Sequence, residues 1–293
     1  MHKQKGVFRL ITMNFRTDLA VESIDVNSLP QGVQMEKRGS AFEITEIIIP
    51  DDSHRDTLGK GKGRYITLEC GEISRFSGDY EDMASELSRE LCRLVPDGDI
   101  FVVGLGNRDI TPDAVGVLAA EKVLATRHLS SELEEDDSFL KSLRPVSCLA
   151  GGVMGQTGIE TAELISAVCR EIKPSAIIAA DALACSDISR LGKTIQISDS
   201  GISPGSGVSN ARCELSSRTL GIPVIAVGVP TVVDMHTIVR SLTGSDIDKR
   251  LPNMMVTPRD IDRLTERAAQ LIAYGINLAL QPKLSFDDVR GLF

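Results

Sequence analysis

The sequence has no apolar run long enough to cross a membrane and no recognisable secretion signal. A spanning helix needs roughly 20 consecutive apolar residues. The most apolar part of the N-terminal leader, GVFRLITMNF, is interrupted by Arg9 and followed by Arg16. No A-x-A-like cleavage site follows it. We therefore expect no membrane association and a protein that stays in the compartment that makes it.

The sequence also has no paired cysteines and no excess of positive charge. Its six cysteines lie singly, without C-x-x-C spacing, so neither a disulfide framework nor a structural zinc site is expected. A reducing cytoplasm is the simplest setting. The formal net charge of -9 argues against a general binder of the nucleic-acid backbone. The basic leader, with Lys3, Lys5, Arg9 and Arg16, precedes a more acidic body.

What the sequence does contain is an alternation of strand and helix patterns along 293 residues, enough for one large α/β domain or two modest ones. Residues 41–50 and 65–70 read as strands that could pair as a hairpin. Continuous apolar runs at 100–106, 175–180 and 222–228 are typical of parallel strands buried on both faces. Helical patterns lie between or beyond the strands, at residues 79–95, 112–129, 158–172, 231–242 and 258–279. The sequence predicts an α/β fold, a doubly wound, mostly parallel sheet flanked by helices with added antiparallel strands.

Two aspartates follow predicted parallel strands, where open α/β sheets bind their ligands. Asp181 comes directly after residues 175–180, and Asp113 lies in the first turn of the helix that Thr111 and Pro112 begin. Each has a structural alternative, because Asp181 could cap a following helix and Asp113 could only compensate its helix dipole. A facing pair could activate water, with Asp113 as base, and protonate a leaving amine, with Asp181 as acid. The same pair could instead hold a divalent metal.

Several apparent motifs do not fit the chemistry that they suggest. Residues 201–205, GISPG, match G-x-S-x-G, but Pro204 has no N–H to donate to an oxyanion. We interpret this segment as a loop that could line a substrate groove. Gly104 and Gly106 match the first two glycines of the dinucleotide-binding pattern G-x-G-x-x-G, but Asp109 stands where the third glycine is required, so the pattern is not met. Residues 59–64, GKGKGR, are not a phosphate-binding loop, because no serine or threonine follows a Gly-Lys pair as that motif requires. This basic loop could meet an acidic peptide, although a solvated hairpin tip is the favoured interpretation.

Six segments, taken in order, resemble the spore germination protease family. They are FRTDLAVE, VVGLGNRDITPDAVG, AGGVMGQTGIET, AADALA, ISDSGISPGSGVSN and GIPVIAVGVPTVVD. The resemblance runs from Phe15 to the PTVVD segment and continues more faintly into the C-terminal helix. It implies an endopeptidase that degrades the small acid-soluble proteins coating DNA in the dormant spore. It also implies a fold similar to that of the hydrogenase-maturation endopeptidases.

The resemblance implies a catalytic pair as well. The acids proposed as catalytic in the family fall on the aspartates of TPDAVG and ADALA, here Asp113 and Asp181. The family is usually classed with the aspartic-type peptidases. One departure lies close by, since Arg108 and Asp109 place two charges in the turn before Asp113.

The N-terminal segment is similar to the family's own cleavage sites. Substrates of the family are cut after the first glutamate of sequences such as Thr-Glu-Ile-Ala-Ser-Glu. Residues 17–22, TDLAVE, have the same order of acid, aliphatic, alanine and second acid. The resemblance implies a zymogen that cuts itself between Asp18 and Leu19. Residues 1–18 would be the propeptide and residues 19–293 a single α/β peptidase domain.

The remaining expectations concern the groove, the partners and the alternatives. Candidate groove residues are Gly106, Asn107, Ser203, Gly205 and Ser206. No cofactor and no metal ligand is assigned. Small acid-soluble spore proteins are the expected substrates, a homotetramer the expected assembly, and the cytoplasm of the forespore and spore core the expected location. Two alternatives stay open, namely a metal-dependent C-terminal endopeptidase of the hydrogenase-maturation type and a non-catalytic peptide-binding protein.

Overall fold

The computed structural model describes most of the chain. It covers residues 17–25, 28–39, 42–75, 80–129, 139–205, 213–245, 248 and 252–293. Residues 1–16 of the expected propeptide and the groove candidate Ser206 lie outside the described residues.

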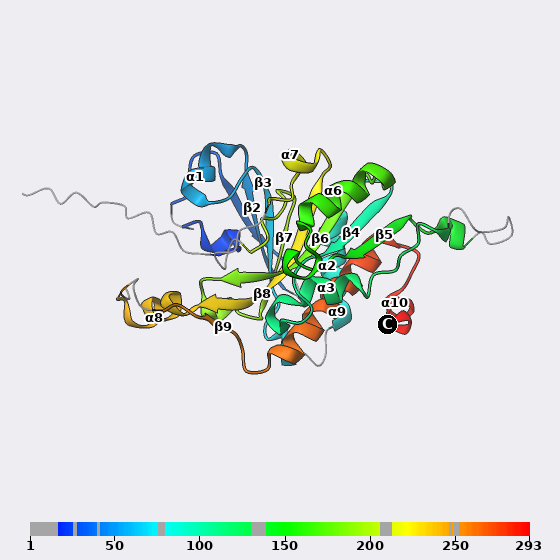
Figure 1. Cartoon of the computed structure of the whole chain (residues 1–293). Helices are drawn as coiled ribbons and strands as arrows, with labels where there is room; N and C mark the ends of the chain where they lie inside the picture. The colour runs from blue at the N-terminus through cyan, green and yellow to red at the C-terminus, as the bar shows by residue number, and fades with distance from the viewer. Residues whose placement is uncertain are drawn as a thin grey trace, which may run out of the picture.

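A mixed β-sheet runs through the molecule (Figure 1) in the order β1-β2-β3-β7-β8-β6-β4-β5, with β9 paired to β8. The strands are β1 Gln34–Arg38, β2 Glu43–Ile49, β3 Gly63–Glu69, β4 Ile100–Gly104, β5 Val146–Ala150, β6 Ala176–Cys185, β7 Thr194–Ser198, β8 Val224–Asp234 and β9 Met255–Val256. Strands β5, β4, β6 and β8 are parallel, whereas β1, β2, β3 and β7 form an antiparallel extension. The predicted α/β class and the hairpin of β2 and β3 are confirmed, and the antiparallel part is larger than expected.

Helices cover both faces of this sheet. The longer ones are α2 Tyr80–Cys92, α3 Val115–Ala120, α6 Thr161–Ile172, α8 Met235–Thr243, α9 Ile261–Leu280 and α10 Phe286–Leu292. Short ones are η1 Ala20–Glu22, η2 Asp52–His54, α1 Arg55–Leu58, η3 Ile73–Arg75, η4 Thr111–Asp113, η5 Leu140–Ser142, α5 Met154–Thr157, η6 Ile188–Arg190 and α7 Ser217–Leu220. Helices α2, α3 and α9 pack on one face, and α6 packs on the other. Leu87 of α2 lies against Gly275 of α9, where a Cβ would stand 2.6 Å from the leucine, so the glycine permits the close approach.

Two central strands are longer than the sequence predicts. Strand β6 continues beyond Ala180 to Cys185, and β8 continues to Asp234 through residues expected to begin a helix. The two extensions pair with one another, so each supplies the other's hydrogen bonds. The valines of PTVVD favour a strand because β-branched side chains fit a pleated surface. Helix α8 begins only after Asp234, whose carboxylate accepts the N–H of Thr237 as an N-cap.

The predicted helix at 112–129 is also shorter than expected. Helix α3 ends at Ala120, and turns follow it. Asn277 of α9 explains the change, because its amide accepts the N–H of Leu124 and donates to the carbonyl of Lys122, 2.9 Å in each case. A buried side chain of another helix thus replaces the continuing helical hydrogen bonds.

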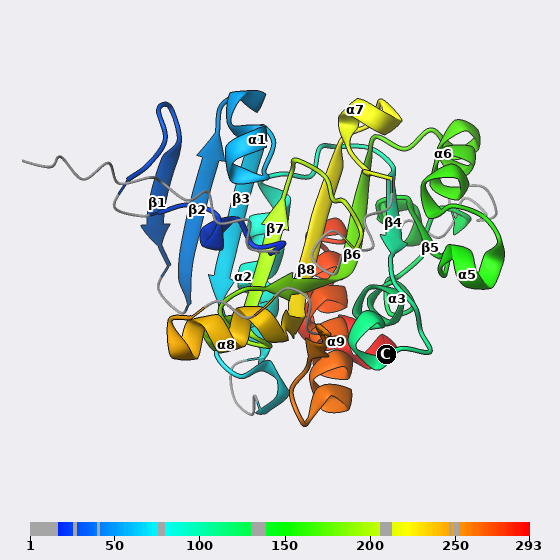
Figure 2. The same ribbon diagram turned by 60° about the vertical axis from the view of Figure 1, so that its left-hand side comes forward.

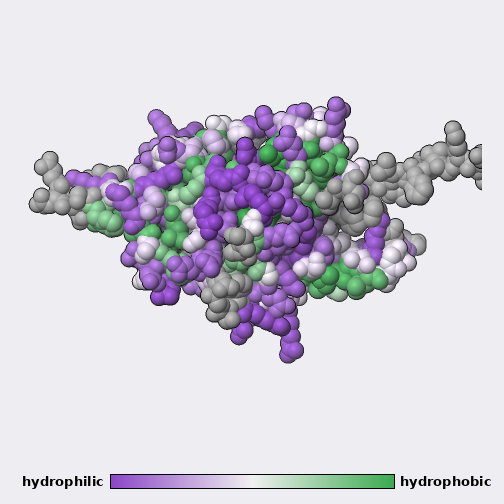
Figure 3. Space-filling model, turned by 180° about the vertical axis from the view of Figure 1, so that it is seen from behind, coloured by the Kyte–Doolittle hydropathy of each residue, from purple (hydrophilic) through white to green (hydrophobic). Residues whose placement is uncertain are grey.

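Hydrophilic side chains cover much of the face shown in Figure 3, and apolar side chains gather at several places, among them the arm formed by α8 and β9. Leu242, Met254 and Met255 on this arm expose 75%, 60% and 38% of their area. Within the described residues, none of the helices has the length and apolar character that a bilayer span requires.

Candidate active site

The centre of the sheet contains a topological switch point between β4 and β6. From β4 the chain passes to β5 on one side, and the next strand, β6, pairs with the other side of β4. The connections that leave β4 and β6 therefore run in opposite directions, and α/β proteins bind ligands beyond the carboxyl ends of the strands at such a switch point. Asp113 follows β4 and Asp181 lies on β6, so both are candidates for a site at this switch point.

The turn after β4 holds Asp113 in place. The backbone N–H of Asn107 donates to the Asp113 carboxylate over 2.9 Å. Gly106 has φ of +103°, and a Cβ there would stand 1.9 Å from the backbone oxygen of Asp113, so only glycine fits. The hydroxyl of Thr231 donates to the carbonyl of Pro112 over 2.7 Å and ties η4 to β8. Two of the predicted groove residues, Gly106 and Asn107, thus build the turn that positions Asp113.

Asp181 lies inside β6 rather than at its end. It is paired in register with Gly228 of β8, and the strand continues to Cys185. The alternative that Asp181 caps a following helix is therefore wrong. The next short helix, η6, is capped by Asp187, whose carboxylate accepts the N–H of Ser189. Asp181 is 5% exposed, a buried carboxylate without a helix to cap.

Strand β6 loses its pairing with β4 close to Asp181. Pairing between β4 and β6 ends where Gly104 meets Ala180, so β4 does not cover the edge of β6 at Asp181. The short helix η4, which ends at Asp113, packs against β6 instead. Side chains alternate along a strand, so Asp181 lies on the same face of the sheet as Leu183.

The N-terminal segment crosses this same face (Figure 2). Asp18 pairs with the extended end of β6, since its N–H donates to the carbonyl of Ala184 over 2.9 Å. The N–H of Ala184 donates in turn to the Asp18 carboxylate over 2.8 Å. Leu19 is fully buried in an apolar cluster with Leu183. The expected scissile pair is therefore held on β6, at Ala184, which lies beyond Asp181 on the same strand.

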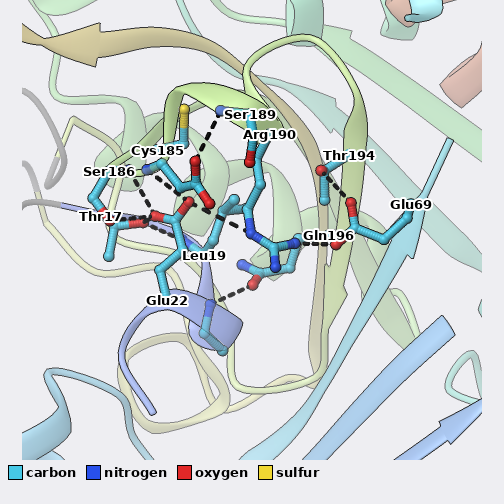
Figure 4. Close-up of polar contacts among 12 residues, drawn as sticks. Thr17, Leu19, Glu22, Glu69, Cys185, Ser186, Ser189, Arg190, Thr194 and Gln196 are labelled. Carbon is cyan, nitrogen blue, oxygen red and sulfur yellow. Dashed lines mark hydrogen bonds and ion pairs between the residues drawn. The ribbon is translucent and has the colours of Figure 1, made fainter. Parts of the chain in front are cut away.

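The carbonyl oxygen of Asp18 accepts hydrogen bonds from two side chains. Lys60 Nζ and Gln196 Nε2 each lie 2.7 Å from it. Gln196 Oε1 accepts the N–H of Ala20 over 2.6 Å, the bond drawn at Gln196 in Figure 4. Burial lowers the pKa of Lys60, although the charges of Asp18 and Glu22 act in the opposite direction. For Lys60, the expectation of a solvated hairpin tip is wrong, because the loop places this cation on the N-terminal segment.

Glu22 occupies a polar socket at the other end of the segment. Its carboxylate accepts the N–H and the hydroxyl of Ser186 at 2.6 and 2.7 Å and the N–H of Asp187 at 3.1 Å. The hydroxyl of Thr17 also donates to it, and Arg190 Nε lies 3.9 Å away (Figure 4). The side chain is 4% exposed, so the socket satisfies a buried carboxylate and would discriminate against a neutral residue.

A pocket of about 150 Å³ lies beside Asp18. Its polar lining includes Arg55, Lys60, Tyr65, Gln196, Ser198, Ser200, Ser203 and Glu214. Of the predicted groove residues, Ser203 lines this pocket, and Gly205 lies two residues farther along the same loop. Arg55 in this lining pairs with Glu214 over 3.4 Å, and Lys60 donates to the backbone carbonyls of Thr17 and Asp18.

Sequence reasoning did not assign Lys60, Gln196 or the Glu22 socket to the site. One signal was available for Gln196, because polar Thr194, Gln196 and Ser198 alternate with apolar Ile195 and Ile197 along β7. That pattern predicts a strand with one polar face, but it does not say what the face binds. Among the described residues, His, Cys, Asp and Glu side chains do not gather in groups of three or more that could hold a metal ion.

Comparison with known proteins places the chain among the germination proteases. The family model described as germination protease matches residues 15–245. The germination protease of Clostridium tetani is 39% identical over 94% of this chain and 98% of its own length. That of Priestia megaterium is 39% identical over 94% of this chain and 76% of its own length. A solved nickel–iron hydrogenase maturation protease from Thermococcus kodakarensis KOD1 is 22% identical, covers 64% of this chain and 98% of its own, and has a TM-score of 0.34.

Proposed function

The chain belongs to the germination protease family and is an endopeptidase, and we propose that it is the self-processing zymogen of the enzyme that begins the degradation of small acid-soluble spore proteins. Self-cleavage would occur between Asp18 and Leu19. The substrates named here come from the family resemblance, and the cleavage position is supported by the contacts of residues 17–22.

The observation that carries the proposal is the way residues 17–22 lie against β6, the strand that carries Asp181. Backbone and side chain of Asp18 bond to Ala184 of β6, and Leu19 is buried against Leu183. Glu22 is held in a socket of backbone and hydroxyl donors. A main-chain bond from Asp18 to β6 and separate sites for the side chains of Leu19 and Glu22 hold the segment, a combination that peptide-binding proteins also use.

The proposed mechanism uses the two aspartates at the switch point. Asp113 accepts a proton from a water molecule as the water oxygen adds to the carbonyl carbon of Asp18. The tetrahedral intermediate then collapses, the bond to the Leu19 nitrogen breaks, and Asp181 donates a proton to that nitrogen. The half-buried position of Asp113 and the burial of Asp181 support different roles for the two carboxylates.

The same contacts support a preference for acids on both sides of the cut. An acid before the scissile bond would accept the N–H of Ala184, as Asp18 does, close to the charge of Lys60, and an acid in the position of Glu22 would meet the donors of Ser186 and Asp187. Small acid-soluble spore proteins would present such a sequence in the forespore and spore core. We also propose a homotetramer, and the exposed apolar side chains of the α8–β9 arm support contacts between copies.

Self-processing of purified full-length chain tests the proposal. Intact mass spectrometry should show the loss of residues 1–18 from the wild type, whereas D113N and D181N should keep them. D109N is a matched control, because Asp109 is an exposed acid in the same turn as Asp113. Wild-type processing in both D113N and D181N would contradict the two-aspartate mechanism. A wild type that stays whole, or is cut elsewhere, would contradict self-cleavage at Asp18–Leu19.

A further inference from the structure

We propose that Lys60 and Gln196 form an oxyanion site that stabilises the negative charge developing on the carbonyl oxygen of the residue before the cut. This inference rests on the proposed cleavage of the Asp18–Leu19 bond. It assigns catalytic contacts to two residues from distant parts of the chain, a loop after α1 and the central strand β7.

The distances fit that role. Lys60 Nζ and Gln196 Nε2 both lie 2.7 Å from the Asp18 oxygen. Oxyanion donors act at about 2.7–3.1 Å from the oxygen that becomes charged. One donor is a cation and the other a neutral amide, so the attraction strengthens as the carbonyl oxygen changes from a partial to a full negative charge.

Gln196 also contacts the backbone that follows the scissile bond. Its Oε1 accepts the N–H of Ala20 over 2.6 Å, while its Nε2 donates to Asp18, so one amide spans the backbone around the scissile bond. Gln196 is 7% exposed, and its neighbours Ile195 and Ile197 are buried in the core on the opposite face of the sheet. A rigid strand therefore sets the position of the donor, as a preorganised site requires.

Lys60 is brought to the segment by a short glycine-bounded loop. Gly59 ends α1 with φ of 67°, and the chain then places Lys60 Nζ within 3.2 Å of the Thr17 carbonyl as well as 2.7 Å of that of Asp18. A purely structural role would be to clamp the N-terminal segment in place. That role and the catalytic one differ in what they predict, because a clamp changes binding whereas an oxyanion site changes the rate of the chemical step.

The step balances without any further reactant. Water adds to the Asp18 carbonyl carbon, its proton passes to Asp113, and the carbonyl electron pair moves onto the oxygen that Lys60 and Gln196 contact. When the carbonyl re-forms, the C–N bond breaks and the Leu19 nitrogen takes a proton from Asp181. Lys60 and Gln196 keep their protons throughout and act only as hydrogen-bond donors.

The test measures kcat and KM for a synthetic peptide, FRTDLAVESI, with processed enzyme carrying single substitutions. Q196E keeps the size of the side chain and an acceptor for Ala20 but loses the donor to Asp18. K60M removes the cation and keeps the length. We expect each to lower kcat by about 10²–10³-fold with KM changed only a few-fold, and K60R to recover part of the loss. K62M is the matched control, because Lys62 is exposed in the same loop.

The outcomes separate this inference from the proposed function. If the wild type cuts the peptide and K60M and Q196E reach the wild-type kcat, or change KM alone, the oxyanion site is overturned while the proposed function stands. If the wild type does not cut between aspartate and leucine, the proposed function fails and this inference fails with it. Thermal melting of each variant shows whether a loss of kcat accompanies an intact fold.

Discussion

Gln196, in the middle of β7, donates a hydrogen bond of 2.7 Å to the carbonyl oxygen of Asp18, a residue 178 positions earlier in the chain. This bond joins the N-terminal segment to β7, while the bonds of Asp18 to Ala184 join it to β6, the strand that carries Asp181. It explains how a segment that looks like a cleavage site can be held on the enzyme's own face. The predictions below test the parts of that arrangement.

Replacing Gly106 by alanine should disturb Asp113. A Cβ at this φ of +103° would stand 1.9 Å from the Asp113 backbone oxygen, so η4 would have to move. We expect a loss of about 1–2 kcal/mol from the backbone conformation alone, with self-processing slowed at least about tenfold. Thermal melting and intact mass measure the two effects.

The control for Gly106 is Gly155 of α5. An added Cβ there meets nothing within 4 Å, so G155A should leave melting temperature and processing near wild type. Equal behaviour of G106A and G155A would show that the turn after β4 does not position a catalytic group.

Replacing Glu22 by glutamine should slow self-processing by roughly tenfold, about 1.4 kcal/mol. The glutamine has almost the same shape, but it loses the charge-assisted bonds from Ser186 and Asp187 and the charge facing Arg190. The rate follows from the appearance of the processed mass with time. E36Q, at an exposed acid of β1, should process normally. A wild-type processing rate for E22Q would mean that the socket does not distinguish the charged carboxylate of Glu22 from a neutral amide.

The pH dependence of the cleavage rate should report Lys60. Burial lowers the pKa of this lysine, so its charge is lost as pH rises through a value below the ordinary 10.5. The rate should fall with the charge. K60R should lack this alkaline limb, because arginine stays protonated. The other titratable groups around this lysine and its pocket are Asp18, Glu22, Arg55, Tyr65 and Glu214. Burial raises the pKa of Tyr65 and moves its titration to higher pH. An identical limb in K60R would contradict the assignment.

Acid should destabilise the fold through the buried ion pairs of Glu90. Burial alone would raise the pKa of Glu90, but the hydrogen bonds of Arg38 and Arg93 outweigh it and leave the pKa below 4.5. The stability from this carboxylate is therefore full above pH 4.5 and is lost as pH falls through the lower folded pKa. We expect E90Q to cost roughly 2 kcal/mol at pH 7 and to flatten the acid limb.

Denaturant unfolding between pH 7 and 3 measures this effect. E43Q is the control, because the pair of Glu43 with Lys37 is exposed and should add little to stability. Equal unfolding free energies for E90Q and wild type at pH 7 would show that the buried pair contributes nothing.

Much of the fold follows from hydrophobic patterning, and the exceptions have physical causes. Apolar runs predict β4, β6 and β8 because strands buried on both faces must be apolar throughout. The extensions of β6 and β8 could not be predicted, since each is a strand only because the other pairs with it. The early end of α3 depends on Asn277, which lies in a helix far along the chain.

The candidate site was predictable only in part. Asp113 comes after β4 and Asp181 lies within β6, so the sequence identified both as candidates at a switch point, and their joint role stays a prediction. Lys60 and Gln196 gave no comparable signal, because their role depends on a tertiary contact with Asp18. A lysine in a glycine-rich loop and a glutamine in a strand are ordinary until the N-terminal segment is placed beside them.

Digestion of a small acid-soluble spore protein by the chain that starts at Leu19 tests the central claim most directly. Mass spectrometry of the early products locates the first cut. The account predicts a single early cleavage after an acid that is followed by an aliphatic residue, an alanine and, two positions after the alanine, a second acid. It also predicts that D113N and D181N are inactive. An undigested spore protein, a first cut at another kind of sequence, or wild-type digestion by both variants would contradict it.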